Sequence, residues 1–261
     1  MARSRSLERR EQALIDLYEA AEAELIRQIA RDVQNEAMGS ARYRRRRLEA
    51  IRKFLADLQD QAIPIATEII GAAYIAGATS ATRAVKAGVP DFGSGINRGA
   101  MELLADNLVS GLNGAAEMLG RRIDDLYRRA GLEIASANIG TGGTLRDATN
   151  ALVRLLQESG LNVAPGGASS WRLSRYAEMV VRTNTTDAIV RGNVNAALEE
   201  GFDLVEVLVV DDEILCDICG PYAGEIYTLT DREGYETLDE LPPFHPNCRC
   251  DLNILTSDPN A

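Results

Sequence analysis

The chain contains a single histidine among its 261 residues, which leaves few routes to catalysis. A serine or cysteine nucleophile needs an imidazole base beside it, and a lone histidine supplies one only if it has no other role. The metalloprotease pattern H-E-x-x-H and the deaminase pattern H-x-E ahead of P-C-x-x-C are both absent. We therefore expect a protein that is not an enzyme.

Aromatic residues are also scarce, at 5% of the chain, whereas apolar residues as a whole make up 46%. A core with so few rings consists of Leu, Ile, Val and Ala, which suits closely packed helices. Basic residues are nearly missing from the last part of the chain. Residues 201–261 hold 2 basic and 14 acidic side chains, while residues 1–200 hold 26 and 25. This asymmetry argues against a C-terminal region that binds DNA phosphates.

No long uninterrupted hydrophobic run is present. The basic N-terminus lacks the apolar segment of a signal peptide, so we expect none. The most apolar stretch, residues 62–85, is interrupted by Pro64, Glu68 and a Ser/Thr cluster. It predicts a buried helix and no membrane span.

The four cysteines and the histidine all fall within the last fifty residues. Cys216 and Cys219 form a C-x2-C pair, and His245 and Cys248 form an H-x2-C pair, which is the spacing of a tetrahedral metal site. Pro and Asn lie between His245 and Cys248 at the central positions of a potential β-turn. We predict a structural zinc ion bound by Cys216, Cys219, His245 and Cys248.

Several alternatives to this site remain. Cys250 would share a strand face with Cys248 and is able to replace His245 as the fourth ligand. Inert thiols without a metal are the main alternative to a zinc site. Disulfides are less favoured because no secretory signal is present. A redox role of the thioredoxin-like segment Cys219-Gly220-Pro221-Tyr222 is less favoured because no βαβ pattern precedes it. A catalytic zinc is less favoured too, since four protein ligands leave no open position.

Helical periodicity covers most of the chain. Residues 6–38 and 48–62 carry apolar side chains at three- and four-residue steps, with Gly39-Ser40 between them. They predict a helical hairpin or an extended helical arm. The narrow apolar stripe suits packing against a partner helix, and the alternative is an ordinary helix at the edge of a bundle. Further helices are predicted at residues 63–88, 97–130, 144–159 and 172–200, with glycines 111, 114 and 120 as points where the second of these is kinked or split. Trp171 is expected to open the last helix and anchor it to the core.

Short valine-rich segments predict strands at residues 204–210, 225–229 and 250–255. So small a core gains stability from a metal, on the order of several kcal/mol. The predicted fold is mainly α, with an extended helical N-terminal region and a small α+β module that has a short antiparallel sheet and a zinc knuckle. The predicted divisions are a helical arm (1–60), a helical region (61–160), a linker (161–170) and the zinc-bound module (171–261).

A basic run lies near the start of the second helical segment. Its five arginines offer phosphate-binding groups for DNA or an acidic protein surface, although such runs are often solvated helix faces. They are Arg42, Arg44, Arg45, Arg46 and Arg47.

Residues 207–250 resemble the C-terminal region of phage minor head proteins, the Mu F-like head-morphogenesis family. The features that carry the resemblance are a strand, an acidic turn, Cys216-x-x-Cys219, Gly224-Glu225-Ile226-Tyr227 and Pro242-Pro243-x-His245-Pro246-Asn247-Cys248-Arg249-Cys250. It extends back to Arg182-Thr183-Asn184, where Asn184 stands at the position of the family's glutamate, and covers about residues 172–261.

The resemblance implies a virion structural protein, made in the bacterial host cytoplasm and located inside the head near the portal. Its implied partners are the portal protein and a capsid or scaffold protein, and its implied role is in capsid assembly and DNA packaging or ejection. Two alternatives are a zinc-dependent hydrolase or nuclease and a prophage-derived zinc module that delivers an effector. The second needs a downstream domain, and the eleven residues after Cys250 lead us to expect none.

Overall fold

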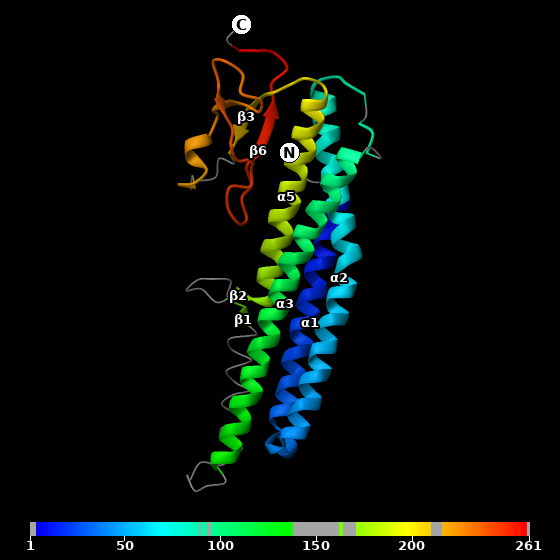
Figure 1. Ribbon diagram of the computed structural model, residues 1–261, viewed down its shortest axis with the longest axis vertical. Helices are drawn as coiled ribbons and strands as arrows, with labels where there is room; N and C mark the ends of the chain where they lie inside the picture. Colours follow the sequence, from blue (N-terminus) through cyan, green and yellow to red (C-terminus); the bar gives the residue numbers. More distant parts are fainter. Residues whose placement is uncertain are drawn as a thin grey trace. The chain divides into compact units, whose positions relative to one another are not determined.

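The computed structural model describes residues 4–88, 90–92, 95–137, 162–163, 171–209 and 216–259. This part of the chain is mainly helical with a small sheet near the C-terminus, as the sequence predicts (Figure 1). The long helices are α1 (Arg5–Val33), α2 (Ala41–Ala84), α3 (Gly95–Ala137) and α5 (Leu173–Glu199), and the 3-10 helices are η1 (Glu36–Gly39) and η2 (Gly220–Tyr222). The strands are β1 (Asn162–Val163), β2 (Trp171–Arg172), β3 (Leu204–Leu208), β4 (Ile226–Thr228), β5 (Glu236–Thr237) and β6 (Asp251–Ile254).

Two compact units are built from alternating parts of the chain. The first, called the sheet unit here, consists of Met1–Gln12, Ile65–Leu108 and Met179–Ala261. The second, called the helical unit, consists of Ala13–Pro64 and Val109–Glu178. The linker predicted at 161–170 contains β1, and its other residues lie outside the described part, as does the helix predicted at 144–159. The predicted domain limits therefore stay a prediction.

In the helical unit, α1, α2 and α3 run side by side (Figure 1). Their buried faces consist of the aliphatic residues expected from the three- and four-residue spacing, among them Leu14, Leu25 and Ile29 of α1 and Ile51 and Leu55 of α2. The chain breaks at η1, where the Asn35 side chain accepts a hydrogen bond from the Ala37 amide and caps the short helix.

A buried carboxylate holds the three helices together beyond η1. Asp32 of α1 accepts hydrogen bonds from Arg47 Nε at 2.7 Å, from the Tyr43 hydroxyl at 3.2 Å and from the Tyr127 hydroxyl of α3 at 2.6 Å. A buried charge needs such partners, because an unpaired one costs several kcal/mol. Burial, helped by this contact, raises the pKa of the Tyr127 phenol.

The second helix is longer than predicted and is not interrupted. We expected separate segments at 48–62 and 63–88, but α2 continues from Ala41 through Pro64 to Ala84. Pro64 is exposed, and the apolar face passes it without a break at Ala62, Ala66 and Ile69. Continuous burial of this face outweighs the one backbone hydrogen bond that proline cannot make. The glycines of α3 likewise do not interrupt it.

In the sheet unit, two glycines let α2 and α5 approach at backbone distance. A Cβ added at Gly77 would lie 1.9 Å from the carbonyl oxygen of Ile189, and one added at Gly192 would lie 2.1 Å from that of Tyr74. Beside this contact the Tyr74 hydroxyl donates to Asn97 of α3 at 2.7 Å. The two helices thus pack without an intervening layer of side chains.

The sheet has the strand order β5-β4-β3-β6. Strand β3 pairs antiparallel with both β4 and β6, while β5 pairs parallel with β4. The sheet is therefore mixed, and not wholly antiparallel as predicted, because β5 was not identified from the sequence. The α5 side chain of Asn193 donates to the Leu252 carbonyl of β6 at 2.9 Å, and α5 contributes Val190, Val194 and Ala197 to the core beneath the sheet.

Two further predictions concern Trp171 and the apolar helix α2. Trp171 lies in β2, paired with Val163, and α5 begins two residues later at Leu173; the side chain of Trp171 is not among those described. Among described residues, α2 is the one helix long and apolar enough to cross a membrane. Core helices of globular proteins have the same property, so this does not establish a span.

Candidate functional site

The first pair of cysteines follows β3 and leads into η2. The Gly220 amide donates to the Cys216 carbonyl at 2.7 Å, and the Tyr222 amide donates to the Cys219 carbonyl at 3.0 Å. These two bonds wind the C-x2-C segment into successive tight turns. Tight turns bring the two sulfurs to the same side, as metal-binding loops require.

The second pair lies in the turn that precedes β6. The Cys248 amide donates to the His245 carbonyl at 3.0 Å, and Asn247 has φ of 60°, a left-handed conformation that asparagine tolerates well. The β-turn predicted from Pro246 and Asn247 is confirmed.

A threonine of α5 holds this turn in place. Thr183 Oγ1 accepts a hydrogen bond from the Asn247 amide at 3.0 Å and donates its own proton to the Met179 carbonyl at 2.8 Å. Sequence reasoning gave this threonine no role at the site, although it belongs to the Arg182-Thr183-Asn184 segment singled out by resemblance. Arg182 itself is exposed.

The two segments bring five metal-ligating side chains together. They form two groups of three within which all ligand atoms lie within 4.8 Å of one another. One group is Cys216, Cys219 and His245, and the other is Cys219, Cys248 and Cys250. Cys219 belongs to both. Of the predicted ligands, Cys216, Cys219 and His245 form the first group, while Cys248 lies with the alternative ligand Cys250 in the second; the two groups are joined through Cys219, and the four predicted ligands are not all within 4.8 Å of one another.

Three distances between ligand atoms match the edges of a tetrahedral zinc site. Bond lengths of about 2.3 Å for Zn–S and about 2.0 Å for Zn–N give ligand separations of about 3.8 Å between two sulfurs and about 3.5 Å between sulfur and nitrogen. Cys219 Sγ lies 3.7 Å from Cys248 Sγ. His245 Nε2 lies 3.4 Å from Cys216 Sγ and 3.2 Å from Cys219 Sγ.

The histidine is oriented for this role by its other nitrogen. His245 Nδ1 lies 2.9 Å from the Pro246 carbonyl oxygen. A carbonyl only accepts, so Nδ1 carries the proton and Nε2 presents its lone pair to the sulfurs. Metal-binding histidines are commonly fixed by such a contact.

The thiols lie in a largely dry environment. Cys219, Cys248 and Cys250 are buried, with Val209 and Phe244 packed against them, and Phe244 stacks on Tyr222 at 4.4 Å between ring centroids. All four cysteines are free thiols.

The surroundings of the four cysteines shift the thiol pKa values in opposite directions. Burial raises the pKa of Cys219 and raises that of Cys250 to about 11, whereas the amides of Cys219 and Ile218 lower the pKa of Cys216. Deprotonation of the buried thiols therefore needs a cation beside them, and a bound metal supplies one.

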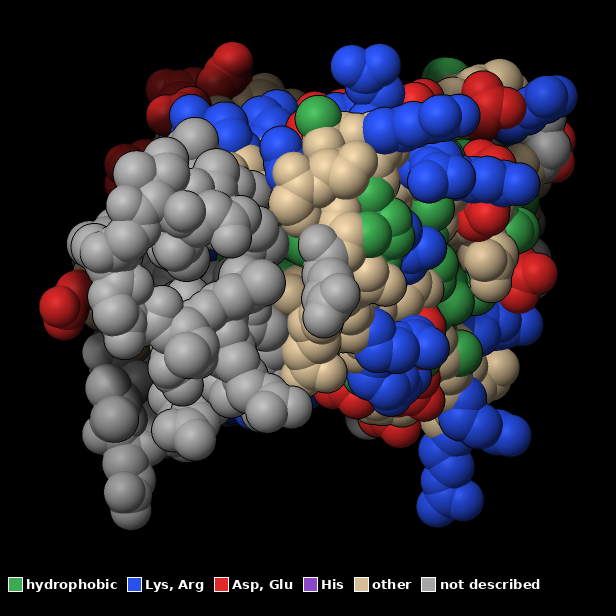
Figure 2. Space-filling view, turned by 90° about the horizontal axis from the view of Figure 1, so that it is seen from below, with side chains coloured by type: hydrophobic (Ala, Val, Ile, Leu, Met, Phe, Trp, Pro, Cys, Tyr) green, Lys and Arg blue, Asp and Glu red, His purple; other side chains and the backbone are tan. Residues whose placement is uncertain are grey.

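The arginine run occupies the first two turns of α2 (Arg42, Arg44, Arg45, Arg46 and Arg47) and is not used uniformly. Arg44 donates to the carbonyls of Met38 and Gly39 at 2.7 and 2.9 Å, and Arg47 binds Asp32. Arg42, Arg45 and Arg46 are exposed. Lys and Arg side chains recur over the described surface seen from below (Figure 2).

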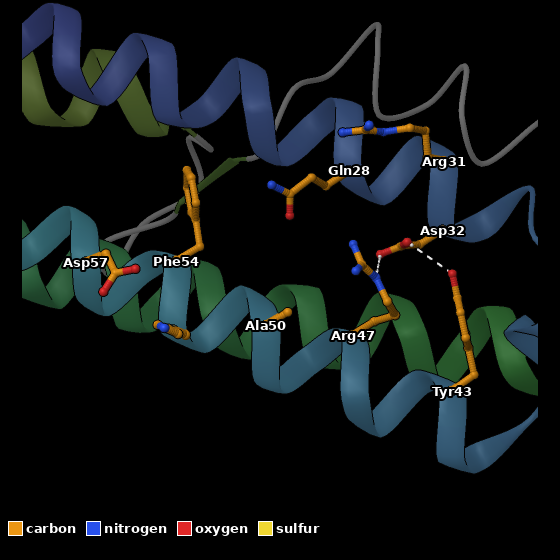
Figure 3. A pocket seen from close by; sticks show the side chains of 9 residues that line it. Gln28, Arg31, Asp32, Tyr43, Arg47, Ala50, Phe54 and Asp57 are labelled. Carbon is orange, nitrogen blue, oxygen red and sulfur yellow. Dashed lines mark hydrogen bonds and ion pairs between the residues drawn. The ribbon is translucent and has the colours of Figure 1, made fainter.

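Two pockets of the helical unit flank these turns. One, of about 590 Å³, is lined by Arg31, Asp32, Arg47 and Lys53 among others, and Figure 3 shows Arg47 and Tyr43 both directed at Asp32. The other, of about 610 Å³, is lined in part by Arg44, Arg45 and Arg128.

Comparison with known proteins identifies one family. No curated protein and no solved structure gives a significant match. The family described as phage minor capsid protein 2 matches residues 3–250, which is nearly the whole chain and far more than the C-terminal region in which the resemblance was noticed. The expectation of a phage minor head protein is thereby confirmed, and the chain belongs to the phage minor capsid protein 2 family.

Proposed function

We propose that this protein is a structural and assembly component of the phage head that associates with the portal vertex and aids capsid assembly and DNA packaging or ejection. Membership of a minor capsid protein family supports a structural role in the virion. The resemblance of residues 207–250 to the Mu F-like head-morphogenesis family supports the narrower placement inside the head, beside the portal. A protein that docks between larger components needs rigid surfaces more than a reactive centre.

The rigid element of the C-terminal part is, in this proposal, a structural zinc site. Its ligands are Cys216, Cys219, Cys248 and His245, with Cys250 as the competing fourth ligand. The observation that carries this proposal is the convergence of two turns, one between β3 and β4 and one before β6, which brings three pairs of ligand atoms to the separations of a tetrahedral zinc site. An ion there ties the β3–β4 connection to the segment before β6 and adds stability that the core of so small a sheet does not supply.

The metal is proposed to be architectural. Four protein ligands saturate a tetrahedral ion, which leaves no position for a water nucleophile or a substrate. Within the described residues, the groups able to hold a metal contain only cysteine and histidine, and no carboxylate joins them as a general base. A zinc-dependent hydrolase or nuclease, and a module for effector delivery, have no observation in their favour.

The test combines metal content with portal association. The purified chain is expected to carry one zinc ion by mass spectrometry and to co-purify with the portal protein of the same phage when the two are co-expressed. Cys219→Ser is expected to lose the zinc, because Cys219 belongs to both groups of ligands. Ile218→Ala, at an exposed side chain between the two cysteines, is the matched control that keeps it. A zinc-loaded chain that does not bind the portal protein would refute the portal placement and leave the zinc site intact.

A further inference from the structure

The five arginines of the α2 N-terminus divide into an internal pair and an external set. Arg44 and Arg47 are half-buried and are used by the fold, on the carbonyls that end η1 and on Asp32. Arg42, Arg45 and Arg46 make no ion pair or hydrogen bond within the described part of the chain. We call these three the arginine triad.

The triad occupies one face of the helix. Positions 42, 45 and 46 are related by steps of three and four residues, so their side chains are neighbours on the helix surface. All three are exposed. The intervening Tyr43 and the following Arg47 turn toward Asp32 (Figure 3), so the two sets of side chains leave the helix in different directions.

This arrangement disfavours folding. Like charges at three- and four-residue steps repel each other. Cations at the N-terminal end of a helix also oppose the helix dipole, and the first turn of α2 contains no acidic residue to offset them. Several other exposed arginines of the same unit are paired, as Arg52 is with Asp124 at 2.8 Å and Arg128 with Asp125 at 3.0 Å. Three unpaired guanidinium groups at this one place therefore indicate an anionic ligand from outside the chain.

We propose that Arg42, Arg45 and Arg46 bind the phosphate backbone of double-stranded DNA without regard to sequence. Guanidinium groups match phosphate oxygens in pairs, and contacts to phosphate carry no sequence information. The inference rests on the proposed function, because a protein inside a phage head lies against the packaged genome. It specifies a partner and the three side chains that contact it.

A second anionic surface is the acidic C-terminal part of another copy of the chain, where residues 201–261 hold 14 acidic and 2 basic side chains. Duplex DNA is favoured over it because linear charge of that density releases condensed counterions on binding, a gain that a folded acidic surface offers to a smaller degree. The two ligands give different results in the experiment below.

The experiment measures binding of the zinc-loaded full chain to two 30-base-pair duplexes of unrelated sequence by fluorescence anisotropy between 50 and 200 mM salt. The wild type is expected to bind both equally. Arg42→Ala/Arg45→Ala/Arg46→Ala is expected to lower the slope of log K against log salt by about 2.7, or about 0.9 for each lost phosphate contact. Arg9→Ala/Arg83→Ala/Arg98→Ala, three exposed positions in the sheet unit, removes the same charge and is expected to keep the slope.

A thermal melting curve checks that the triad variant is folded. The variant is expected to be at least as stable as the wild type, because repulsion among the three arginines has been removed. Equal slopes for the wild type and the triad variant, or equal losses in the two triple variants, overturn the proposal. A third outcome also overturns the proposal. In it, the wild type binds no DNA but self-associates in a salt-sensitive way in sedimentation, and the triad variant does not self-associate. The ligand of the triad is then a second copy of the chain. The triad variant is expected to co-purify with the portal protein as the wild type does, so a failure of DNA binding is distinguishable from a failure of the portal placement.

Discussion

The five ligating side chains of the cysteine–histidine cluster predict an unusual mutational pattern. A tetrahedral ion takes four ligands, and the cluster offers Cys216, Cys219, Cys248, His245 and Cys250. His245→Ala and Cys250→Ala each leave four donors, so both single variants are expected to retain about one zinc ion per chain. The double variant leaves three protein donors and is expected to lose the metal at low free zinc.

The size of the effect follows from binding linkage. With free zinc at about 1,000 times Kd, the ion stabilises the native state by about 4.1 kcal/mol. If removal of the native fourth ligand forces the substitute into place and weakens affinity about 100-fold, the same zinc concentration contributes about 1.4 kcal/mol. Removal of the substitute alone leaves the full contribution, and the double variant has close to none. The single variant with the larger loss therefore identifies the native ligand.

The assay combines three measurements on dialysed protein: zinc content by mass spectrometry, affinity by competition with a chromophoric chelator, and unfolding with and without zinc. Ile218→Ala serves as the matched control, because its side chain is 53% exposed and lies within the C-x2-C segment. A double variant that stays fully loaded would refute the reasoning. So would two single variants that each empty the site, because the fifth donor then has no capacity to substitute.

Four further substitutions test the packing of the helices. Gly77→Ala is expected to destabilise the protein by about 3 kcal/mol or more in urea unfolding, because the added Cβ would meet the Ile189 carbonyl. Gly71→Ala in the same helix is the control: its Cβ meets open space, and the change is expected to stabilise the protein by about 0.5–1 kcal/mol. Tyr18→Phe is expected to stabilise by about 1 kcal/mol, because the buried hydroxyl has no hydrogen-bond partner among described atoms. Burial raises the pKa of Tyr18, so above about pH 10 this residue makes stability fall by about 1.4 kcal/mol per pH unit. Tyr127 acts in the same direction, so the variant is expected to make the alkaline unfolding slope shallower by the share of Tyr18 alone. Asp32→Ala is expected to cost about 3–5 kcal/mol in thermal or urea unfolding, and a loss below about 1 kcal/mol would show that its three donors find other partners.

Periodic patterns in the sequence predicted the helices well, because burial of an apolar stripe decides both the pattern and the element. Proline and glycine were weighted too heavily. Pro64 and the glycines of α3 lie inside unbroken helices, since tertiary burial exceeds the local cost. Strand β5 was missed because Glu236 and Thr237 are two residues without alternation, and only their pairing with β4 makes them a strand.

The metal site was predictable to the level of its two loops. The turn at Pro246 and Asn247 has a local cause, so the sequence contains it. The position of Thr183 does not, because its partner, the Asn247 amide, lies 64 residues along the chain. The choice between His245 and Cys250 depends on which donor the ion selects, and both side chains reach the cluster. The division of the arginine run likewise required coordinates, since Asp32 and the η1 carbonyls claim two of its members.

The backbone contact between α2 and α5 has a mechanical consequence for the zinc-bound end. Helix α5 bears Thr183, which fixes the metal turn, and Asn193, which fixes β6, while Gly192 locks it against α2. A helix pair clasped main chain to main chain has no soft layer to absorb displacement. When a docking partner displaces the metal turn, α5 and the part of α2 packed against it are therefore expected to move together.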